Sequence, residues 1–197
     1  MDETFDAVGE ALCCAAAIRL SGAVQVLTER SGLLDNYNSI MAGVENITAF
    51  LDGLELDNDL LGHAFGESWC LGASYPTGLA GRAFVDDWSR LVFGTVGLTK
   101  PKQCNYVAAR ALDFASQAAA AWPSAIRIGS FDSLARFELA CQQEAEDRLR
   151  KDGLPALWKL AEVRSKQYRQ AAEQGASPLV VDTGCYAAVV SVVDRCS

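Results

Sequence analysis

The chain has 197 residues and a mass of 21.1 kDa, the size of one domain or of one domain with an appendage. Hydrophobic residues make up 50% and charged residues 21%, so the chain can bury a core and is not expected to be disordered. The net charge of −8 excludes a free-standing basic nucleic-acid-binding protein.

The charge is unevenly distributed. Residues 1–99 hold 4 Arg, no Lys and 14 Asp or Glu, whereas residues 100–197 hold 13 Lys or Arg and 11 Asp or Glu. Such asymmetry indicates either an interaction surface or a set of helices with acidic solvent faces.

The N-terminal quarter predicts a helical hairpin. Apolar residues recur every three or four positions over 5–27 and again over 33–51, which is the pattern of one helix face. Gly32 and Gly53 follow these segments and are typical helix stops. Because the joint is short, the two helices are expected to pack antiparallel.

The next segment lacks this regularity. Four glycines and a proline punctuate residues 54–78, which predicts a long loop or a series of short turns. Helical spacing returns at Leu79 and is expected to end at Gly94 and Gly97, before a basic connector at 99–102.

Three further helices are predicted in the second half. One runs over about 105–122 and stops at Pro123, and its alanines allow neighbours to approach its backbone closely. Ser130 is expected to cap a segment that reaches residue 153, and Pro155 opens a charged helix to about residue 174. The tail after this helix fits either a strand or a helix.

Together these elements predict an all-α protein, a helical bundle with a four-helix-bundle core plus an additional C-terminal helix and tail. We expect the bundle core to span residues 1–153 and the C-terminal helix and tail to span 154–197.

The seven cysteines are odd in number and form no CxxC pair, so reduced thiols in an intracellular protein are expected. Cys13 and Cys14 lie among alanines and are predicted to be small core residues. The acidic N-terminus has no basic signal region, and no uninterrupted apolar run reaches about 18 residues, so we expect no membrane contact.

Catalytic signals are sparse. The single histidine, His63, is seven residues from Cys70, a spacing that is more often incidental than a thiol activated by an imidazole. The stretch 57–59 offers oxygen ligands but lacks the glycine and distant glutamate of a calcium loop. Phosphate-loop, dinucleotide and nucleophile-elbow motifs are absent, so we expect no enzyme activity, no catalytic residue, no metal, no cofactor and no small-molecule substrate.

Interaction is better supported than catalysis. Large aromatic residues recur in the loops and helix ends, and any that stay exposed are candidate interface anchors: Phe65, Trp69, Tyr75, Trp88, Phe93, Trp122 and Trp158. Basic residues cluster in mid-chain and are candidate nucleic-acid-binding residues: Arg82, Arg90, Lys100, Lys102, Arg110 and Arg127. The alternative is that they pair with nearby carboxylates, namely Asp86, Asp87 and Asp113.

Several short motifs follow one another in an order that resembles a known family: Ala17-Ile18-Arg19-Leu20-Ser21, Leu79-Ala80-Gly81-Arg82-Ala83, Ser89-Arg90-Leu91, Ala109-Arg110-Ala111-Leu112-Asp113-Phe114-Ala115, Ile126-Arg127-Ile128-Gly129-Ser130-Phe131-Asp132 and Arg136-Phe137-Glu138. This order resembles the coat proteins of rod-shaped helical plant RNA viruses of the tobamovirus and furovirus type. The Arg110–Asp113–Phe114 segment is similar to a signature of flexuous filamentous virus coat proteins.

The resemblance implies a four-helix bundle that self-assembles as a helical homo-oligomer around single-stranded RNA, in the virion or the host cytoplasm. It implies that Arg82, Arg90 and Arg110 hold phosphates, with Asp113 as the salt-bridge partner of Arg110. Asp86 and Asp87 are then candidates for the inter-subunit carboxylates whose raised pKa values favour assembly at low pH. A cytoplasmic all-helical adaptor that binds another protein is the alternative, and an enzyme using His63 and Cys70 comes third.

Overall fold

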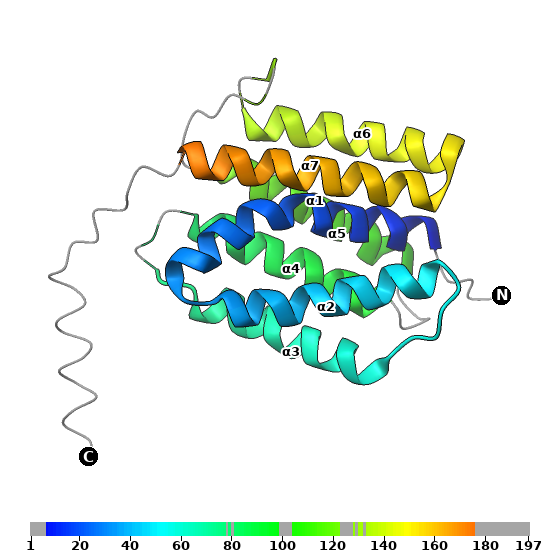
Figure 1. Ribbon diagram of the computed structural model, residues 1–197, viewed down its shortest axis with the longest axis horizontal. Helices are drawn as coiled ribbons and strands as arrows, with labels where there is room; N and C mark the ends of the chain where they lie inside the picture. The colour runs from blue at the N-terminus through cyan, green and yellow to red at the C-terminus, as the bar shows by residue number, and fades with distance from the viewer. Residues whose placement is uncertain are drawn as a thin grey trace, which may run out of the picture.

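The part of the chain that the structure describes is a bundle of seven α-helices (Figure 1). The computed structural model describes residues 7–77, 79, 81–98, 104–122, 128, 130, 131 and 133–175, with the backbone alone for 96–98, 104–110 and 175. Within these residues the only pairing of extended backbone is an isolated bridge between Ile128 and Phe131, so the predicted all-α class is confirmed. The helices are α1 (Ala7–Ser31), α2 (Leu34–Leu51), α3 (Asn58–Ser74), α4 (Arg82–Leu98), α5 (Cys104–Ala120), α6 (Leu134–Asp152) and α7 (Leu154–Gly175).

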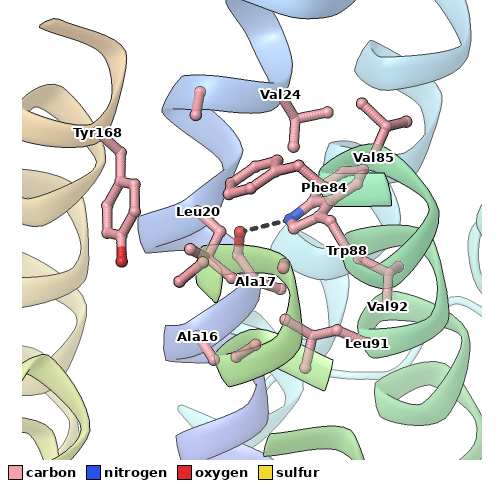
Figure 2. Close-up of a cluster of buried hydrophobic side chains, with 14 of the residues drawn as sticks. Ala16, Ala17, Leu20, Val24, Phe84, Val85, Trp88, Leu91, Val92 and Tyr168 are labelled. Carbon is pink, nitrogen blue, oxygen red and sulfur yellow. Dashed lines mark hydrogen bonds between the residues drawn. The ribbon is translucent and has the colours of Figure 1, made fainter. Parts of the chain in front are cut away.

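Helix α1 lies at the centre of the bundle and contacts α2, α4, α5, α6 and α7. Figure 2 shows Phe84 and Trp88 of α4 on one side of α1 and Tyr168 of α7 on the other. The indole nitrogen of Trp88 donates a hydrogen bond of 3.0 Å to the carbonyl oxygen of Ala17. A helix enclosed in this way is apolar on all sides rather than along one stripe, and the predicted burial of Cys13 and Cys14 is confirmed.

Small residues allow this central helix to approach its neighbours closely. A Cβ atom on Gly22 would lie 2.0 Å from the carbonyl oxygen of Ser165 on α7, so only glycine fits where α1 and α7 cross.

Helix α1 is strongly apolar over most of its length. By length and composition alone, this helix is apolar enough to cross a membrane. Because 83% of its most apolar 18-residue window is buried inside the bundle, the packing against other helices accounts for that composition.

The segment expected to be a loop over 54–78 is largely helical, which corrects the prediction. Helix α3 begins after Asp57, whose carboxylate accepts hydrogen bonds from the backbone N–H groups of Asp59 and Leu60 at 2.9 and 3.1 Å. Glycine in a helix interior costs only about 1 kcal/mol relative to alanine, and this cap together with burial against α2 and α4 offsets that cost. The glycines therefore lie within the helix instead of interrupting it.

Two other boundaries differ from the prediction. Gly94 lies inside α4, where an added Cβ would be 3.3 Å from the Cβ of Ala111 on α5, so it permits close packing and does not end the helix. Helix α6 begins at Leu134 and not after Ser130, because the hydroxyl of Ser133 accepts a hydrogen bond from the N–H of Arg136.

Helices α6 and α7 form a tight hairpin through Gly153, which has a positive φ of 79°. Helix α7 then packs along α1, and Leu157 and Tyr168 are buried in that contact. The expected division after residue 153 falls in this turn, and the tail whose structure was left open lies outside the described residues.

Candidate functional site

A pocket between α3 and α4 is the best candidate for a functional site. It has a volume of about 240 Å³, and it is open to solvent. Its walls are Ser68, Trp69, Gly72 and Ala73 from α3, and Arg82, Asp86, Ser89, Arg90 and Phe93 from α4.

The turn between the two helices positions this pocket. Gly81 has a φ of 86°, and an added Cβ would meet the Leu27 side chain at 2.8 Å, so the chain turns tightly against α1. The guanidinium of Arg82 donates to the carbonyl oxygen of Tyr75 across the turn. Arg82, which lines the pocket, is thereby held by an uncharged partner.

The aromatic residues Trp69 and Phe93 also line the site, and Phe65 packs beside them. Trp69 is 71% exposed, although tryptophan is usually among the more buried residues. The ring of Phe65 stacks on Phe93 with centroids 4.0 Å apart, and Trp69 lies 6.2 Å from the same Phe93 ring. The expectation that some aromatic residues remain exposed is therefore met at Trp69 and Phe65, which share one surface.

Arg90 fits both interpretations of the mid-chain arginines, as a candidate phosphate-binding residue and as a partner of nearby carboxylates. It lines the pocket, and it also forms ion pairs within α4, at 2.8 Å to Asp86 and 3.7 Å to Asp87. Its guanidinium lies 5.9 Å from the centre of the Phe114 ring on α5. With 55% of the side chain exposed, Arg90 remains accessible to a ligand while it is paired.

Asp86 and Asp87, the expected inter-subunit carboxylates, therefore share one arginine. Partial burial raises the pKa of Asp87, Arg90 opposes that increase, and the neighbouring charge of Asp86 adds to it. Asp87 consequently binds a proton at a higher pH than an ordinary aspartate.

The remaining candidate cations lie outside what the structure describes. Lys100, Lys102 and Arg127 fall in undescribed segments, and Arg110 lies on α5 with only its backbone described. Asp113 is exposed on the same helix, so the expected Arg110–Asp113 pair stays a prediction.

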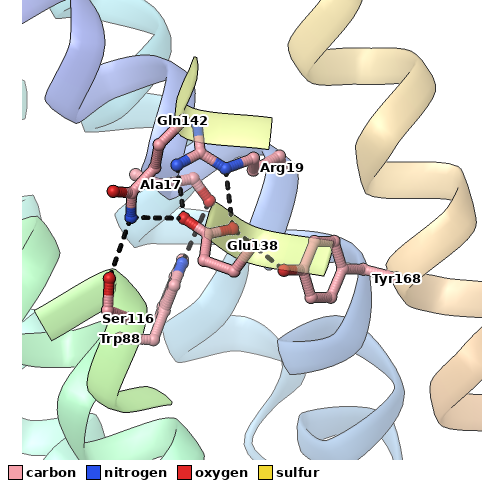
Figure 3. A network of polar contacts seen from close by, with 7 residues as sticks. All are labelled: Ala17, Arg19, Trp88, Ser116, Glu138, Gln142 and Tyr168. Carbon is pink, nitrogen blue, oxygen red and sulfur yellow. Dashed lines mark hydrogen bonds and ion pairs between the residues drawn. The ribbon is translucent and has the colours of Figure 1, made fainter. Parts of the chain in front are cut away.

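Sequence reasoning missed a second polar site, which is buried in the core (Figure 3). Arg19 of α1 and Glu138 of α6 form a two-pronged salt bridge, with 2.9 Å between Nε and Oε2, and their side chains are 2% and 0% exposed. The hydroxyl of Tyr168 donates to the same carboxylate at 2.9 Å, and the amide of Gln142 donates at 2.9 Å. Both ends of the pair fall within the quoted motifs at 17–21 and 136–138, but nothing in a single sequence connects positions 119 residues apart.

The charges in this network stabilise one another. Burial alone would lower the pKa of Arg19, but the charge of Glu138 and the hydrogen bonds to it outweigh burial and raise that pKa. Burial, followed by the charge of Glu138, raises the pKa of Tyr168 and that of the nearby thiol Cys141, the latter to about 12. All three groups keep their protons at neutral pH, so the network is a fixed structural element.

The candidate catalytic residues His63 and Cys70 do not lie close enough together to act as a pair. His63 and Cys70 are both exposed on α3, two turns apart, and are separated by about 10 Å along the helix axis. Asp57 uses its carboxylate as a helix cap, and the residues that the structure describes include no group of three His, Cys, Asp or Glu arranged to hold a metal ion.

Comparisons with models of protein families, with curated proteins and with solved structures find no significant match to this chain. The pocket, the buried network and the motifs therefore carry the functional interpretation.

Proposed function

We propose that this protein is a non-enzymatic structural subunit that self-assembles around single-stranded RNA and contacts phosphates without reading sequence. One observation carries the proposal: Arg82, Arg90 and the exposed Trp69 line the same pocket. The order of motifs that resembles helical virus coat proteins points to the same class of protein.

The chemistry of the pocket suits an unpaired RNA strand. A guanidinium makes two-pronged hydrogen bonds to a phosphate, and an indole ring offers a stacking surface to any base. A flat aromatic beside two arginines can therefore hold a nucleotide by its backbone and its ring face, with little preference for the base.

The net charge of −8 is compatible with such a function only if RNA binding and assembly are coupled. A single acidic subunit repels RNA, whereas an array presents one pocket per subunit to the same strand and gains from multivalency.

Protons would adjust this balance at the pocket. When Asp87 accepts a proton, Arg90 loses one of its two anionic partners and the subunit loses one negative charge. Lowering the pH therefore favours both subunit association and contact between Arg90 and a phosphate.

The test is assembly with RNA at two pH values, read by negative-stain microscopy and by nuclease protection. The wild-type protein should form discs or filaments as the pH falls and should protect RNA, whereas the double variant Arg82→Gln/Arg90→Gln should protect it far less.

Arg150→Gln is the matched control, because Arg150 is also exposed and pairs with an aspartate on its own helix, yet it lies on α6 and outside the pocket. A protein that neither assembles nor protects RNA at any pH would refute the proposal. If the double variant and Arg150→Gln protect RNA equally well, the pocket is not the RNA-binding site.

A protein-binding adaptor is the second candidate, and the exposure of Trp69 favours it. An exposed tryptophan with a polar rim is the usual anatomy of an interaction hot spot. This function predicts small particles at every pH, with no RNA protection and with partner binding that Trp69→Ala abolishes.

A further inference from the structure

We propose that the outer face of α3 is a self-association surface, on which α3 of a second copy packs antiparallel about a two-fold axis. The outer face of α3 is defined here by Asp59, Gly62, Gly66, Trp69, Cys70 and Ala73, which recur at helical spacing and are exposed. This proposal goes beyond the proposed function and does not require RNA.

The outer face of α3 carries both a projection and a hollow. Trp69 projects from it with 71% of its surface exposed. One and two turns towards the N-terminus, Gly66 and Gly62 leave the helix backbone bare, and a Cβ added at either position would meet nothing within 4 Å. The large side chain of Trp69 therefore lies on the same helix face as two positions, Gly62 and Gly66, that have no side chain.

An antiparallel copy brings these two features together. With the two-fold axis close to Gly66, Trp69 of each copy lies over Gly62 of the other, about 10 Å along the helix from its own Gly62. Because a two-fold contact uses the same patch twice, both tryptophans are buried in one step. A burial of roughly 150–250 Å² for each tryptophan would supply much of the interface.

Charge selects the antiparallel direction. The N-terminal end of α3 carries three exposed carboxylates, Glu55, Asp57 and Asp59. At the other end, Arg82 and Arg90 are balanced by Asp86 and Asp87, the two aspartates that pair with Arg90. An antiparallel pair places each acidic end against this formally neutral end of the other copy, whereas a parallel pair would place carboxylates against carboxylates.

A second copy is the occupant that matches all of these features. Its Trp69 can pack over Gly62 of the first copy, and its Gly62 can receive Trp69 of the first copy, at a fixed spacing and without carboxylates facing carboxylates. A single helix pair buries less than the roughly 1,200–2,000 Å² of a standard interface, so the dimer should be weak and dependent on concentration.

The outer face of α3 overlaps the proposed RNA site at Trp69 and Ala73. A two-fold pair is closed and cannot itself propagate a filament, so this contact belongs to the free subunit and RNA should compete with it.

The first experiment is sedimentation velocity of the purified protein under reducing conditions over a range of concentrations, without RNA. The wild type should shift from monomer towards dimer as concentration rises. Trp69→Ala and Gly66→Leu should both remain monomeric, because one removes the projection and the other fills the hollow.

Leu139→Ala is the matched control, since Leu139 is 56% exposed on α6, and it should dimerise like the wild type. A wild type that stays monomeric at every concentration would overturn the proposal. Dimerisation of Trp69→Ala at wild-type strength would overturn it equally.

The second experiment tests the direction by oxidative cross-linking. Antiparallel pairing places Cys70 opposite position 62 of the other copy, so Gly62→Cys should cross-link to Cys70, as mapped by mass spectrometry. Val163→Cys, on an exposed position of α7, is the control and should not cross-link to Cys70. A Cys70–Cys70 cross-link in the wild type would indicate parallel pairing and overturn the proposal.

These outcomes are separate from those of the proposed function. A wild type that is monomeric alone but assembles with RNA, with Trp69→Ala losing RNA protection, would assign the outer face of α3 to RNA and reject the dimer. A concentration-dependent dimer that never protects RNA would support the dimer and reject the coat-subunit function.

Discussion

Two arginine–carboxylate clusters in this molecule share the same chemistry and differ in every other respect. Arg19 and Glu138 are fully enclosed, join α1 to α6, and are held further by Tyr168. Arg90 with its two aspartates lies on α4 alone, with 55% of the Arg90 side chain exposed.

The difference in burial between the two clusters shows which charges are needed to keep the protein folded. A buried ion has given up its water shell, so its partner cannot be removed without leaving an uncompensated charge. An exposed pair on one helix is solvated with or without its partner, and contributes little to stability. The first cluster fixes the helix arrangement, while the second remains free to exchange its partner for a ligand.

Removing the carboxylate at the buried site should have the largest effect. Glu138→Gln leaves Arg19 charged and without an anion, and should lower the free energy of unfolding by about 3–5 kcal/mol. Denaturant unfolding followed by circular dichroism measures this change. Glu146→Gln, at an exposed position of the same helix, should change stability by less than about 0.5 kcal/mol.

The double variant Arg19→Met/Glu138→Leu sharpens this test, because it removes both charges and should be more stable than Glu138→Gln. A loss for Glu138→Gln as small as that of Glu146→Gln would mean that the buried pair contributes little to the fold.

Two glycines extend the comparison between buried and exposed regions. Gly22→Ala forces a Cβ against the backbone of Ser165 and should cost about 1–3 kcal/mol as the α1–α7 crossing opens. Gly62→Ala meets open space and should stabilise α3 by up to about 1 kcal/mol. Thermal unfolding of both variants should move the melting temperature in opposite directions; a shift in the same direction would contradict the packing described here.

A substitution in the exposed cluster should reduce RNA binding with little effect on stability. Arg90→Gln should lower the free energy of unfolding by less than about 1 kcal/mol, since the ion pairs are solvated and lie within one helix. Nuclease protection of RNA should nevertheless fall. A large loss of stability would place Arg90 with Arg19 as a structural residue.

The smallest effect is expected in the pH dependence of stability. Because the pKa of Asp87 is raised in the folded state above its ordinary 3.8, ionised Asp87 penalises folding at neutral pH, and the penalty vanishes below the unfolded pKa. Asp87→Asn should therefore gain stability relative to the wild type as the pH rises from about 3 to about 7. Unfolding curves across this range measure the difference, and a gain that instead grows on acidification would reverse the assigned direction.

The fold was largely predictable because six helices follow periodic apolar spacing with clear stops. Helix α3 was not, since Gly62, Gly66 and Gly72 resemble punctuation in a sequence. In the structure Gly72 packs closely where α3 meets α4, and an added Cβ would lie 3.2 Å from a carboxylate oxygen of Asp86. The other two face solvent, where a helix tolerates them.

The candidate site was predictable only in part. Proximity in the chain suggested that Arg90 would pair with Asp86 and Asp87, and helical spacing is enough to bring them together. The exposure of Trp69 depends on where α3 lies in the bundle, and the contact between Arg19 and Glu138 depends on how α1 meets α6. Neither follows from local spacing.

The central position of α1 has a consequence for the order of folding. During synthesis this apolar helix leaves the ribosome before the other described helices, and α7, the helix that covers much of it, is completed more than a hundred residues later. Contacts so distant along the chain form slowly, because a long loop must close before they contribute. The nascent chain must therefore carry an incompletely covered apolar helix until α7 has been made, and a product truncated before α7 would be a natural substrate for chaperones.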